Sequence, residues 1–258
     1  MLQPRIIPFL LIHQGGLVKT TRFSSSKYVG DPLNAVRIFN EKQVDELIVA
    51  DMDATVLNAE PDYSLIQSIA SECRMPLCYI GGVKTVTQVE RIVSLGVEKV
   101  GIGACSIYNP EVIQEAALRV GSQSIVSIFD IKKTGLFGRY EIFTHNGKTA
   151  TGIEPVEMAI KVQSLGAGEI LCNSIDRDGT LKGYDFDLIN TIHNAVTVPL
   201  SVIGGAGSLD HMQELIDHFG LIGASAGSMF VFKGKYRAVL IQYPNPEDRM
   251  RMSKLKAP

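Results

Sequence analysis

The stretch Pro76-Leu77-Cys78-Tyr79-Ile80-Gly81-Gly82 returns later in the chain as Pro199-Leu200-Ser201-Val202-Ile203-Gly204-Gly205. The same separation relates Glu46-Leu47-Ile48 to Glu169-Ile170-Leu171. Short apolar runs that end in glycine are typical of buried parallel strands followed by tight turns. Because two independent segments repeat with one period, we interpret the chain as a structural unit that is used twice.

Four further apolar runs bring the number of predicted strands to eight, and the runs alternate with helical patterns, which is typical of βαβ units. A four-strand half that occurs twice buries both of its edge strands by closing on itself. The sequence therefore predicts an α/β fold, a single (β/α)8 TIM barrel with an internal twofold half-barrel repeat, over residues 1–243; an open doubly wound sheet is the weaker alternative. The predicted strands are Arg5–Ile12, Glu46–Asp51, Leu77–Ile80, Lys99–Gly103, Ser124–Asp130, Glu169–Ser174, Leu200–Ile203 and Leu221–Ala226.

Composition narrows the functional classes. The chain has 258 residues, 45% of them hydrophobic, which suffices for one large core. A net charge of −2 gives no general attraction to nucleic acid or to an acidic membrane. The apolar run near the N-terminus is too short for a signal peptide or a membrane span, so we expect a cytoplasmic protein. Residues 244–258 form a basic tail without clear periodicity, which we expect to be frayed.

The cysteines give no sign of a metal site or a disulfide. They form no CxxC pair and lie within apolar runs, so we expect buried, reduced thiols. Neither a metal nor a cofactor is predicted. The four positions are Cys73, Cys78, Cys105 and Cys172.

Glycines follow several predicted strands at the C-terminal end of the barrel, where the active sites of this fold lie. Open backbone N–H groups at such turns can bind phosphate, and the symmetric duplication favours two anion sites. Tight βα turns that need glycine are the structural alternative. The positions concerned are Gly81-Gly82, Gly103, Gly204-Gly205 and Gly227-Ser228.

Acidic residues gather at the same end, after strands two, five and six. A carboxylate there can act as a general acid or base if its surroundings raise its pKa. Each alone is more often a loop cap or an ion-pair partner. We expect Lys132 and Lys133 to favour the ionised form of Asp130. The other acids are Asp51, Asp53, Asp176 and Asp178.

Four charged residues open strands at the opposite end of the barrel. Arg5 and Lys99 should meet Glu46 and Glu169 there, because the N-terminal ends of parallel strands converge at one face. On physical grounds alone we favour a charge-balanced layer that closes the barrel floor.

The loop from Gly15 to Gly30 is long and polar, with Lys19, Arg22 and Lys27. In a barrel such a loop can fold over a phosphate as a mobile lid. An ordered contact for a partner protein is the alternative.

Several motifs together resemble the imidazole glycerol phosphate synthase cyclase (HisF) family, up to about Tyr243. They are RIIPFLLI at 5–12, LVKT at 17–20, GDP at 30–32, DELIVADMDAT at 45–55, GSQSIVSIFD at 121–130, THNGK at 144–148, GAGEILCNSIDRDGT at 166–180, GYDFDL at 183–188 and IGGAG at 203–207. The resemblance implies a barrel that takes ammonia from a glutaminase at its N-terminal face and cyclises a bis-phosphorylated aminoimidazole precursor at its C-terminal face.

The resemblance also assigns roles residue by residue. The floor quartet Arg5, Glu46, Lys99 and Glu169 becomes an ammonia gate on a polar passage along the barrel axis. Glu98 and Gln123 lie on the face where the family docks its glutaminase. The implied phosphate-binding residues are Lys19, Gly82, Gly103, Gly204, Gly205, Gly227 and Ser228.

One departure from the family pattern affects the chemistry. The cyclase uses aspartates after strands one and five as its general acid–base pair; here Asp130 is kept, but the other position is Leu11. A leucine transfers no proton, and such groups supply about 10²- to 10⁴-fold in rate, so we expect crippled cyclase activity. Gly103-Ala104, Ile80 and Ile203 also make the mouth less polar than in the family pattern.

The departures, with NAVRIFNEKQVDELIV at 34–49 and GSMFVFKGKYRAVLIQYP at 227–244, resemble the HisF paralogues of surface-polysaccharide clusters. That branch implies ammonia supply to an ATP-dependent sugar amidotransferase that makes an acetamidino sugar. Two alternatives remain. The chain is a working cyclase of histidine biosynthesis, in which Asp130 and either Asp51 or His13 share the lost role, or a docking barrel that only activates the glutaminase.

Overall fold

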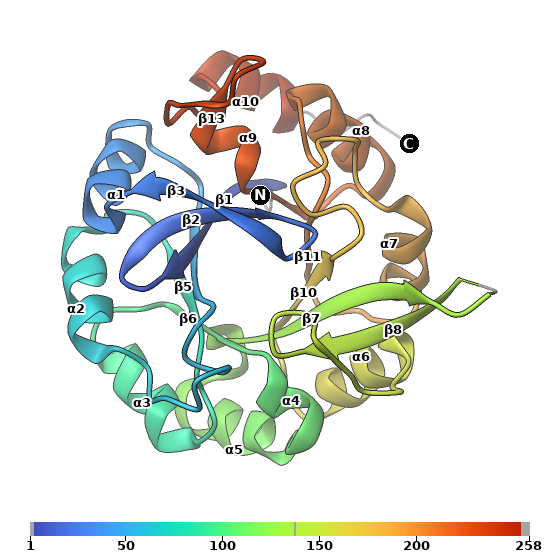
Figure 1. Ribbon diagram of the computed structural model, residues 1–258. Coiled ribbons are helices and arrows are strands. Elements are labelled where there is room, and N and C mark those ends of the chain that lie inside the picture. Colours follow the sequence, from blue (N-terminus) through green and yellow to red (C-terminus); the bar gives the residue numbers. More distant parts are fainter. Residues whose placement is uncertain (1–2, 137, 254–258) are drawn as a thin grey trace.

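The computed structural model describes residues 3–136 and 138–253, and its centre is a closed ring of parallel strands (Figure 1). Strand β1 pairs with both β4 and β12, and β10 pairs with both β7 and β11, so the described barrel has no free edge. All eight predicted strands are found, with ends shifted by a few residues at most. They are β1 (Arg5–His13), β4 (Leu47–Asp51), β5 (Leu77–Ile80), β6 (Lys99–Ile102), β7 (Ile125–Thr134), β10 (Glu169–Ser174), β11 (Leu200–Ile203) and β12 (Gly223–Ala226).

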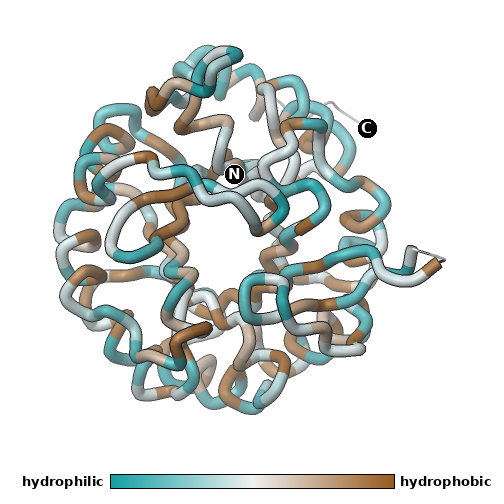
Figure 2. Tube along the Cα trace, viewed as in Figure 1, coloured by the Kyte–Doolittle hydropathy of each residue, from teal (hydrophilic) through white to brown (hydrophobic). Residues whose placement is uncertain are grey.

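Helices surround the ring and cover its outer face. Their apolar sides pack on the strands while their polar sides face outward, and Figure 2 shows the resulting change from brown to teal. The helices are α1 (Pro32–Glu41), α2 (Tyr63–Glu72), α3 (Val86–Ser94), α4 (Ala104–Tyr108), α5 (Glu111–Val120), α6 (Pro155–Ser164), α7 (Phe186–His193), α8 (Leu209–Phe219) and α9 (Ser228–Val231), with a 3₁₀ turn, η1, at Ser122–Ser124.

The half-barrel repeat extends beyond the strands of the ring. Strand β1 runs into an antiparallel hairpin, β2 (Gly16–Thr21) and β3 (Ser24–Gly30), and β7 runs into β8 (Arg139–Thr144) and β9 (Thr149–Ala150). Leu11 pairs with Val18 at the first hairpin, and Asp130 pairs with Phe143 at the second. Leu11 and Asp130 therefore occupy equivalent positions in the two halves.

The barrel interior is more apolar than the sequence analysis expects. A separate core cluster fills it, so the described passage above the floor is not a polar one. Inward-facing positions alternate along each strand, and most of them carry aliphatic side chains. The cluster contains Ile7, Phe9, Ile48, Ala50, Cys78, Ile80, Val126, Ile128, Leu171 and Ile203, with Leu11 packed against it.

The expectation of a frayed tail is wrong for most of its length. After the short hairpin β13 (Phe232–Lys233) and β14 (Ala238–Val239), helix α10 spans Pro246–Ser253. Its Arg249 donates to the carbonyl of Gln43 over 2.7 Å, and Met252 is 1% exposed. These contacts are long-range, so local periodicity carries no sign of them. Residues 254–258 lie outside the described part of the chain.

Candidate active site

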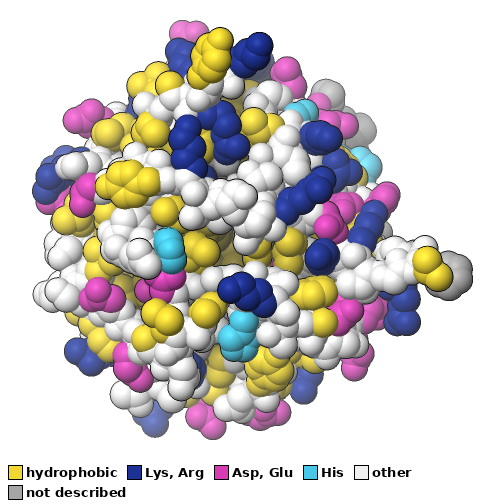
Figure 3. Space-filling view, viewed as in Figure 1, with side chains coloured by type: hydrophobic (Ala, Val, Ile, Leu, Met, Phe, Trp, Pro, Cys, Tyr) yellow, Lys and Arg dark blue, Asp and Glu magenta, His cyan; other side chains and the backbone are white. Residues whose placement is uncertain are grey.

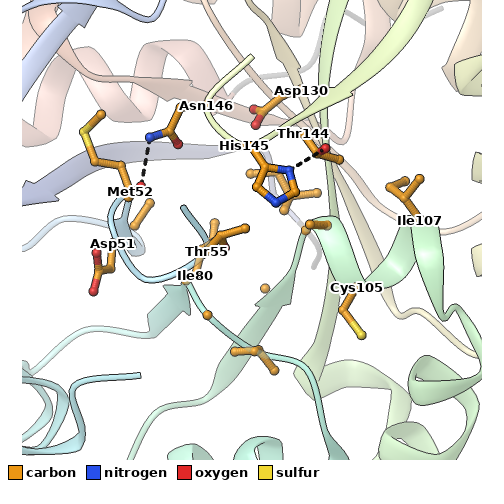
Figure 4. A pocket seen from close by; sticks show the side chains of 18 of the residues that line it. Asp51, Met52, Thr55, Ile80, Cys105, Ile107, Asp130, Thr144, His145 and Asn146 are labelled. Carbon is orange, nitrogen blue, oxygen red and sulfur yellow. Dashed lines mark hydrogen bonds between the residues drawn. The ribbon is translucent and has the colours of Figure 1, made fainter. Parts of the chain in front are cut away.

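A cavity of about 420 Å³ opens at the C-terminal end of the barrel, and its lining comes from the strand ends and loops of β1, β4, β5, β6, β7, β8 and β10. Figure 3 shows this face hollowed at its centre, with hydrophobic side chains inside the hollow. Figure 4 shows Asp130, His145, Cys105 and Ile80 around the cavity. The mouth predicted from barrel topology is therefore a real concave site.

Asp130 is the acidic group that points into this cavity from β7. Asn173 donates a hydrogen bond of 2.8 Å to its Oδ1 atom, and the Oδ1 atom of Asn173 has no partner within residues 3–136 and 138–253. Burial raises the pKa of Asp130 from 3.8 to about 7, although the bond from Asn173 acts in the opposite direction. The group is thus poised to exchange a proton near neutral pH.

The expectation that Lys132 and Lys133 keep Asp130 ionised is wrong. Both lysines are exposed beyond the barrel, where β7 continues into its hairpin. The Lys132 amine lies over the ring of Phe143 and the Lys133 amine over that of Tyr140. Proximity in sequence misleads here because the strand carries the two residues past the cavity.

Leu11 lines the same cavity as Asp130 and packs on the interior cluster. Its apolar side chain occupies the position that the family pattern gives to the second aspartate. The cavity therefore holds one member of the predicted acid–base pair.

His145 also lines the cavity, and sequence reasoning gave it no role. Its Nδ1 atom lies 2.9 Å from Oγ1 of Thr144, and Asn146 donates 2.9 Å to the carbonyl of Met52. His145 and Asn146 have positive φ angles, 52° and 56°, in the loop between β8 and β9. The only sequence signal was the THNGK motif, whose Asn-Gly pair favours such a turn.

The other mouth acids hold loops together. Asp51 lines the cavity, but its Oδ1 atom accepts from the N–H groups of Asp53, at 2.8 Å, and Ala54. Burial raises the pKa of Asp51. The Nδ1 atom of His13 lies 2.6 Å from the Oδ1 atom of Asp53, and the N–H of Gln14 donates to the Oδ2 atom of Asp53. These contacts match the loop-cap alternative.

The glycines of the predicted anion sites fall into two groups. Gly82 and Gly103 line the cavity, whereas Gly204, Gly205 and Gly227 belong to the other half of the mouth. Gly82 and Gly205 have positive φ angles, and an added Cβ would collide with neighbouring loops, so turn geometry alone requires glycine at both.

Gly227 differs because a Cβ there would lie 2.6 Å from the amine of Lys19. Lys19 is 5% exposed and donates to the carbonyl of Phe9. Burial lowers its pKa to about 8, although Asp178 acts in the opposite direction. The structure thus brings Lys19, Gly227 and Ser228 to one place, as an anion site requires.

The long loop after β1 is a β-hairpin that crosses the mouth (Figure 1). Asp178, which follows β10, accepts 2.8 Å from Oγ1 of Thr20 and also accepts from the N–H of Phe23. The N–H of Arg22 bonds to the carbonyl of Asp178. Strand pairing and these bonds hold the segment over the mouth in this structure.

The four charges predicted at the floor meet there. Arg5 contacts Glu46 and lies 2.6 Å from Glu169, while Lys99 lies 2.9 Å from Glu46 and 2.8 Å from Glu169. Burial raises the pKa of Glu169, but Arg5 and Lys99 outweigh it and the net pKa is lowered. The carboxylates likewise raise the pKa of Arg5 against its burial. The quartet is a closed ring of alternating charges.

Two residues predicted at a partner interface are exposed at this floor. Glu98 precedes β6 and accepts from the N–H of Leu77, while Gln123 lies in η1 before β7.

The cysteine expectation is half right. Cys78 and Cys172 are buried, but Cys73 and Cys105 are partly exposed. Within the described ranges, no group of three or more His, Cys, Asp or Glu residues is placed to hold a metal ion. No helix in the same ranges is both long and apolar enough to cross a membrane.

Comparisons with known proteins agree with this geometry. A family model described as histidine biosynthesis protein matches residues 5–237. The chain belongs to this family. A protein of Leptospira interrogans that bears the name imidazole glycerol phosphate synthase subunit HisF is 54% identical over 96% of this chain and 98% of its own length.

Two other relatives in the family carry numbered subunit names. The Vibrio vulnificus protein named hisF3 is 52% identical over 99% of this chain and 98% of its own length. The Pseudomonas aeruginosa protein named hisF2 is 49% identical over 95% and 97%, respectively. The chain is therefore a HisF-like synthase subunit.

Proposed function

We propose that this chain receives ammonia from a HisH-like glutaminase at its floor and releases it at its mouth for glycosyl amidation in surface-polysaccharide biosynthesis. The supporting observation is a contrast between the two ends of the barrel. The floor keeps its ring of Arg5, Glu46, Lys99 and Glu169, whereas the mouth has Leu11 opposite Asp130. The floor thus keeps the charged residues that this proposal assigns to ammonia transfer, whereas the mouth lacks one of the two groups that cyclisation needs.

The apolar interior suits the neutral form of ammonia. A charged ammonium ion would lose its hydration shell among aliphatic side chains such as Ile48 and Leu171, at a large cost in free energy. Neutral ammonia loses much less. The floor ring then has to open, and we assign the gate to Lys99, a point charge on a flexible stem.

At the mouth, Asp130 gives the proposed route a proton acceptor and donor near its exit. Its pKa of about 7 lets both protonation states exist at neutral pH. A protonated Asp130 would transfer its proton to delivered ammonia and remove the nucleophilic lone pair. The ionised carboxylate, which predominates above that pKa, is therefore the productive state, because it can only accept a hydrogen bond from ammonia. The ammonia acceptor in this proposal is an N-acetyl sugar held by an ATP-dependent amidotransferase.

The numbered names of the relatives support a subunit that is distinct from a single histidine enzyme. The exposed Glu98 and Gln123 at the floor suit a glutaminase contact beside the gate.

The second candidate is a cyclase of histidine biosynthesis, favoured by the poised carboxyl of Asp130. It needs another group in place of Leu11. Asp51 and His13 are the groups that the sequence analysis named for this role, yet both are engaged in bonds that hold loops.

The bis-phosphorylated aminoimidazole precursor and an ammonium salt separate the two candidates without any glutaminase. Under our proposal the wild-type chain forms cyclised product slowly, and Leu11→Asp raises the rate by about 10²-fold or more. The control is Leu136→Asp, at a fully exposed position in the β7–β8 hairpin. Rapid cyclisation by wild type that Leu11→Asp leaves unchanged would favour the cyclase instead.

A further inference from the structure

A cluster of cations lies at the C-terminal end of the barrel, where β12 leads into α9 and the hairpin β13–β14. Lys19 and Lys27 reach it from the first hairpin, and Arg237 reaches it from the second. Figure 3 shows Lys and Arg side chains gathered on this part of the mouth face. The sequence analysis singled out Lys19 here, but not Arg237.

Arg237 is held toward Ser228 by an unusual backbone. Its φ angle is 51°, and its N–H closes a turn on the carbonyl of Gly234. Non-glycine residues in this region cost free energy, and such strain is concentrated at functional sites. The guanidinium lies over the ring of Phe232, 4.7 Å from its centroid, and Nη2 donates 3.3 Å to Oγ of Ser228. Its aim is thus fixed by the turn, the ring and the hydroxyl.

The guanidinium also has spare hydrogen-bonding capacity. The Nε atom of Arg237 is buried, yet it has no hydrogen-bond partner in the described chain. A buried donor without an acceptor destabilises the folded state, so the site is incomplete without an anion. Lys27 fixes the turn from the other side, because its amine donates 2.8 Å to the carbonyl of Arg237.

The local charge balance is positive. Lys19 and Arg237 both act on Asp178, whose pKa burial nevertheless raises. That carboxylate is already occupied by Thr20 and Phe23. Two cations therefore share one engaged acid beside the open backbone of Gly227.

We propose that Arg237 is a specificity-determining residue that binds, together with Lys19, the phosphate group of a phosphorylated small molecule at Gly227–Ser228. A planar guanidinium can contact two phosphate oxygens at once, while the lysine amine supplies a point charge. Ser228 turns its hydroxyl from accepting to donating when the anion arrives. The assignment goes beyond the proposed function, which releases ammonia at this mouth and names no phosphorylated ligand there.

Inorganic phosphate is the probe, titrated into the full chain and followed by ³¹P line broadening or calorimetry. We expect Arg237→Gln to weaken phosphate binding about tenfold or more, and Arg237→Lys to weaken it less. Lys235→Gln removes an exposed charge from the same turn and should leave binding unchanged. The melting temperature of each variant shows whether it folds; if Arg237→Gln is destabilised, the comparison of Arg237→Lys with Lys235→Gln decides.

Three results would overturn the assignment. They are equal phosphate affinity in wild type and Arg237→Gln, equal losses in Arg237→Gln and Lys235→Gln, and no phosphate binding by wild type at millimolar concentration. No glutaminase or acceptor enzyme is present in the titration. A failure of ammonia transfer would therefore refute the proposed function and leave this assignment standing, and the converse also holds.

Discussion

Among the acidic residues at the mouth, Asp130 has a deeply buried carboxyl group, and burial raises its pKa to about 7. Between about pH 4 and about pH 7, the carboxyl group of Asp130 is ionised in the unfolded chain but stays protonated in the folded chain. The folded state therefore binds more protons, and its stability falls across that window.

Asp130→Asn should remove this penalty while keeping an acceptor for Asn173. We expect the free energy of unfolding of Asp130→Asn to exceed that of wild type at pH 8 by on the order of 3 kcal/mol, with little difference at pH 4. Urea denaturation at both pH values measures it. Asp187→Asn, at an exposed position in α7, is the control. A constant difference between pH 4 and pH 8 would contradict the burial of this carboxyl.

Single residues also mark the limits of sequence reading. The equivalence of Leu11 and Asp130 was implied by the family resemblance rather than by the repeat, because the repeat separates Pro76 from Pro199 by 123 residues whereas Leu11 and Asp130 are 119 residues apart. The effect of Lys132 and Lys133 was not, since the strand runs on past the barrel and carries their charges outward. His145 and Arg237 were missed because each enters its site through a positive-φ turn, which leaves only a weak trace in the sequence.

At the scale of elements, the charged residues at the starts of four barrel strands stabilise one another as one ion network at the floor. Removing one partner of a buried ion network leaves an uncompensated charge, whereas an exposed pair contributes little. Lys99→Met should therefore lower the free energy of unfolding by about 3 kcal/mol, measured by chemical denaturation. Arg37→Gln, which breaks the exposed pair with Glu72, should leave the free energy of unfolding nearly unchanged, because solvent screens that pair.

The same Lys99→Met variant tests the gate. With the glutaminase present, amidated product per glutamine hydrolysed should change, because a neutral side chain replaces a cation of the ring. Under the docking-barrel alternative, that ratio stays at the wild-type value while glutamine hydrolysis remains stimulated.

Helix α10 shows why the tail was misjudged. Arg249 reaches Gln43 and Asp45, and its guanidinium lies over Tyr243, so the helix depends on partners far away in the sequence. Arg249→Gln should increase amide hydrogen exchange across 246–253 while the barrel strands stay protected. Met250→Gln, at a mostly exposed site of the same helix, is the matched control. Equal exchange in Arg249→Gln and wild type would show that the helix is held by other contacts.

For the molecule as a whole, the interior cluster is the proposed route. Cys78 is a small buried side chain within it, so Cys78→Phe should obstruct the axis, at a cost of about 1–3 kcal/mol in stability. We expect glutamine-dependent amidation to fall strongly while amidation from added ammonium salt persists. Cys78→Ser keeps the volume and should behave like wild type. Parallel loss of both activities would instead indicate general damage.

The fold could be predicted because an eight-strand pattern with a repeat leaves few closed arrangements. The polarity of the interior could not, because inward and outward positions of a parallel strand are both apolar and only the register separates them.

The hairpins that extend β1 and β7 give the two halves the same backbone at the point where their chemistry differs. A duplicated ancestor would have carried one copy of each reactive position on either side, so loss on one side left the architecture intact. The barrel can therefore lose a reactive group on one side of the mouth and still fold. The freed position is one at which a new acceptor specificity can be selected.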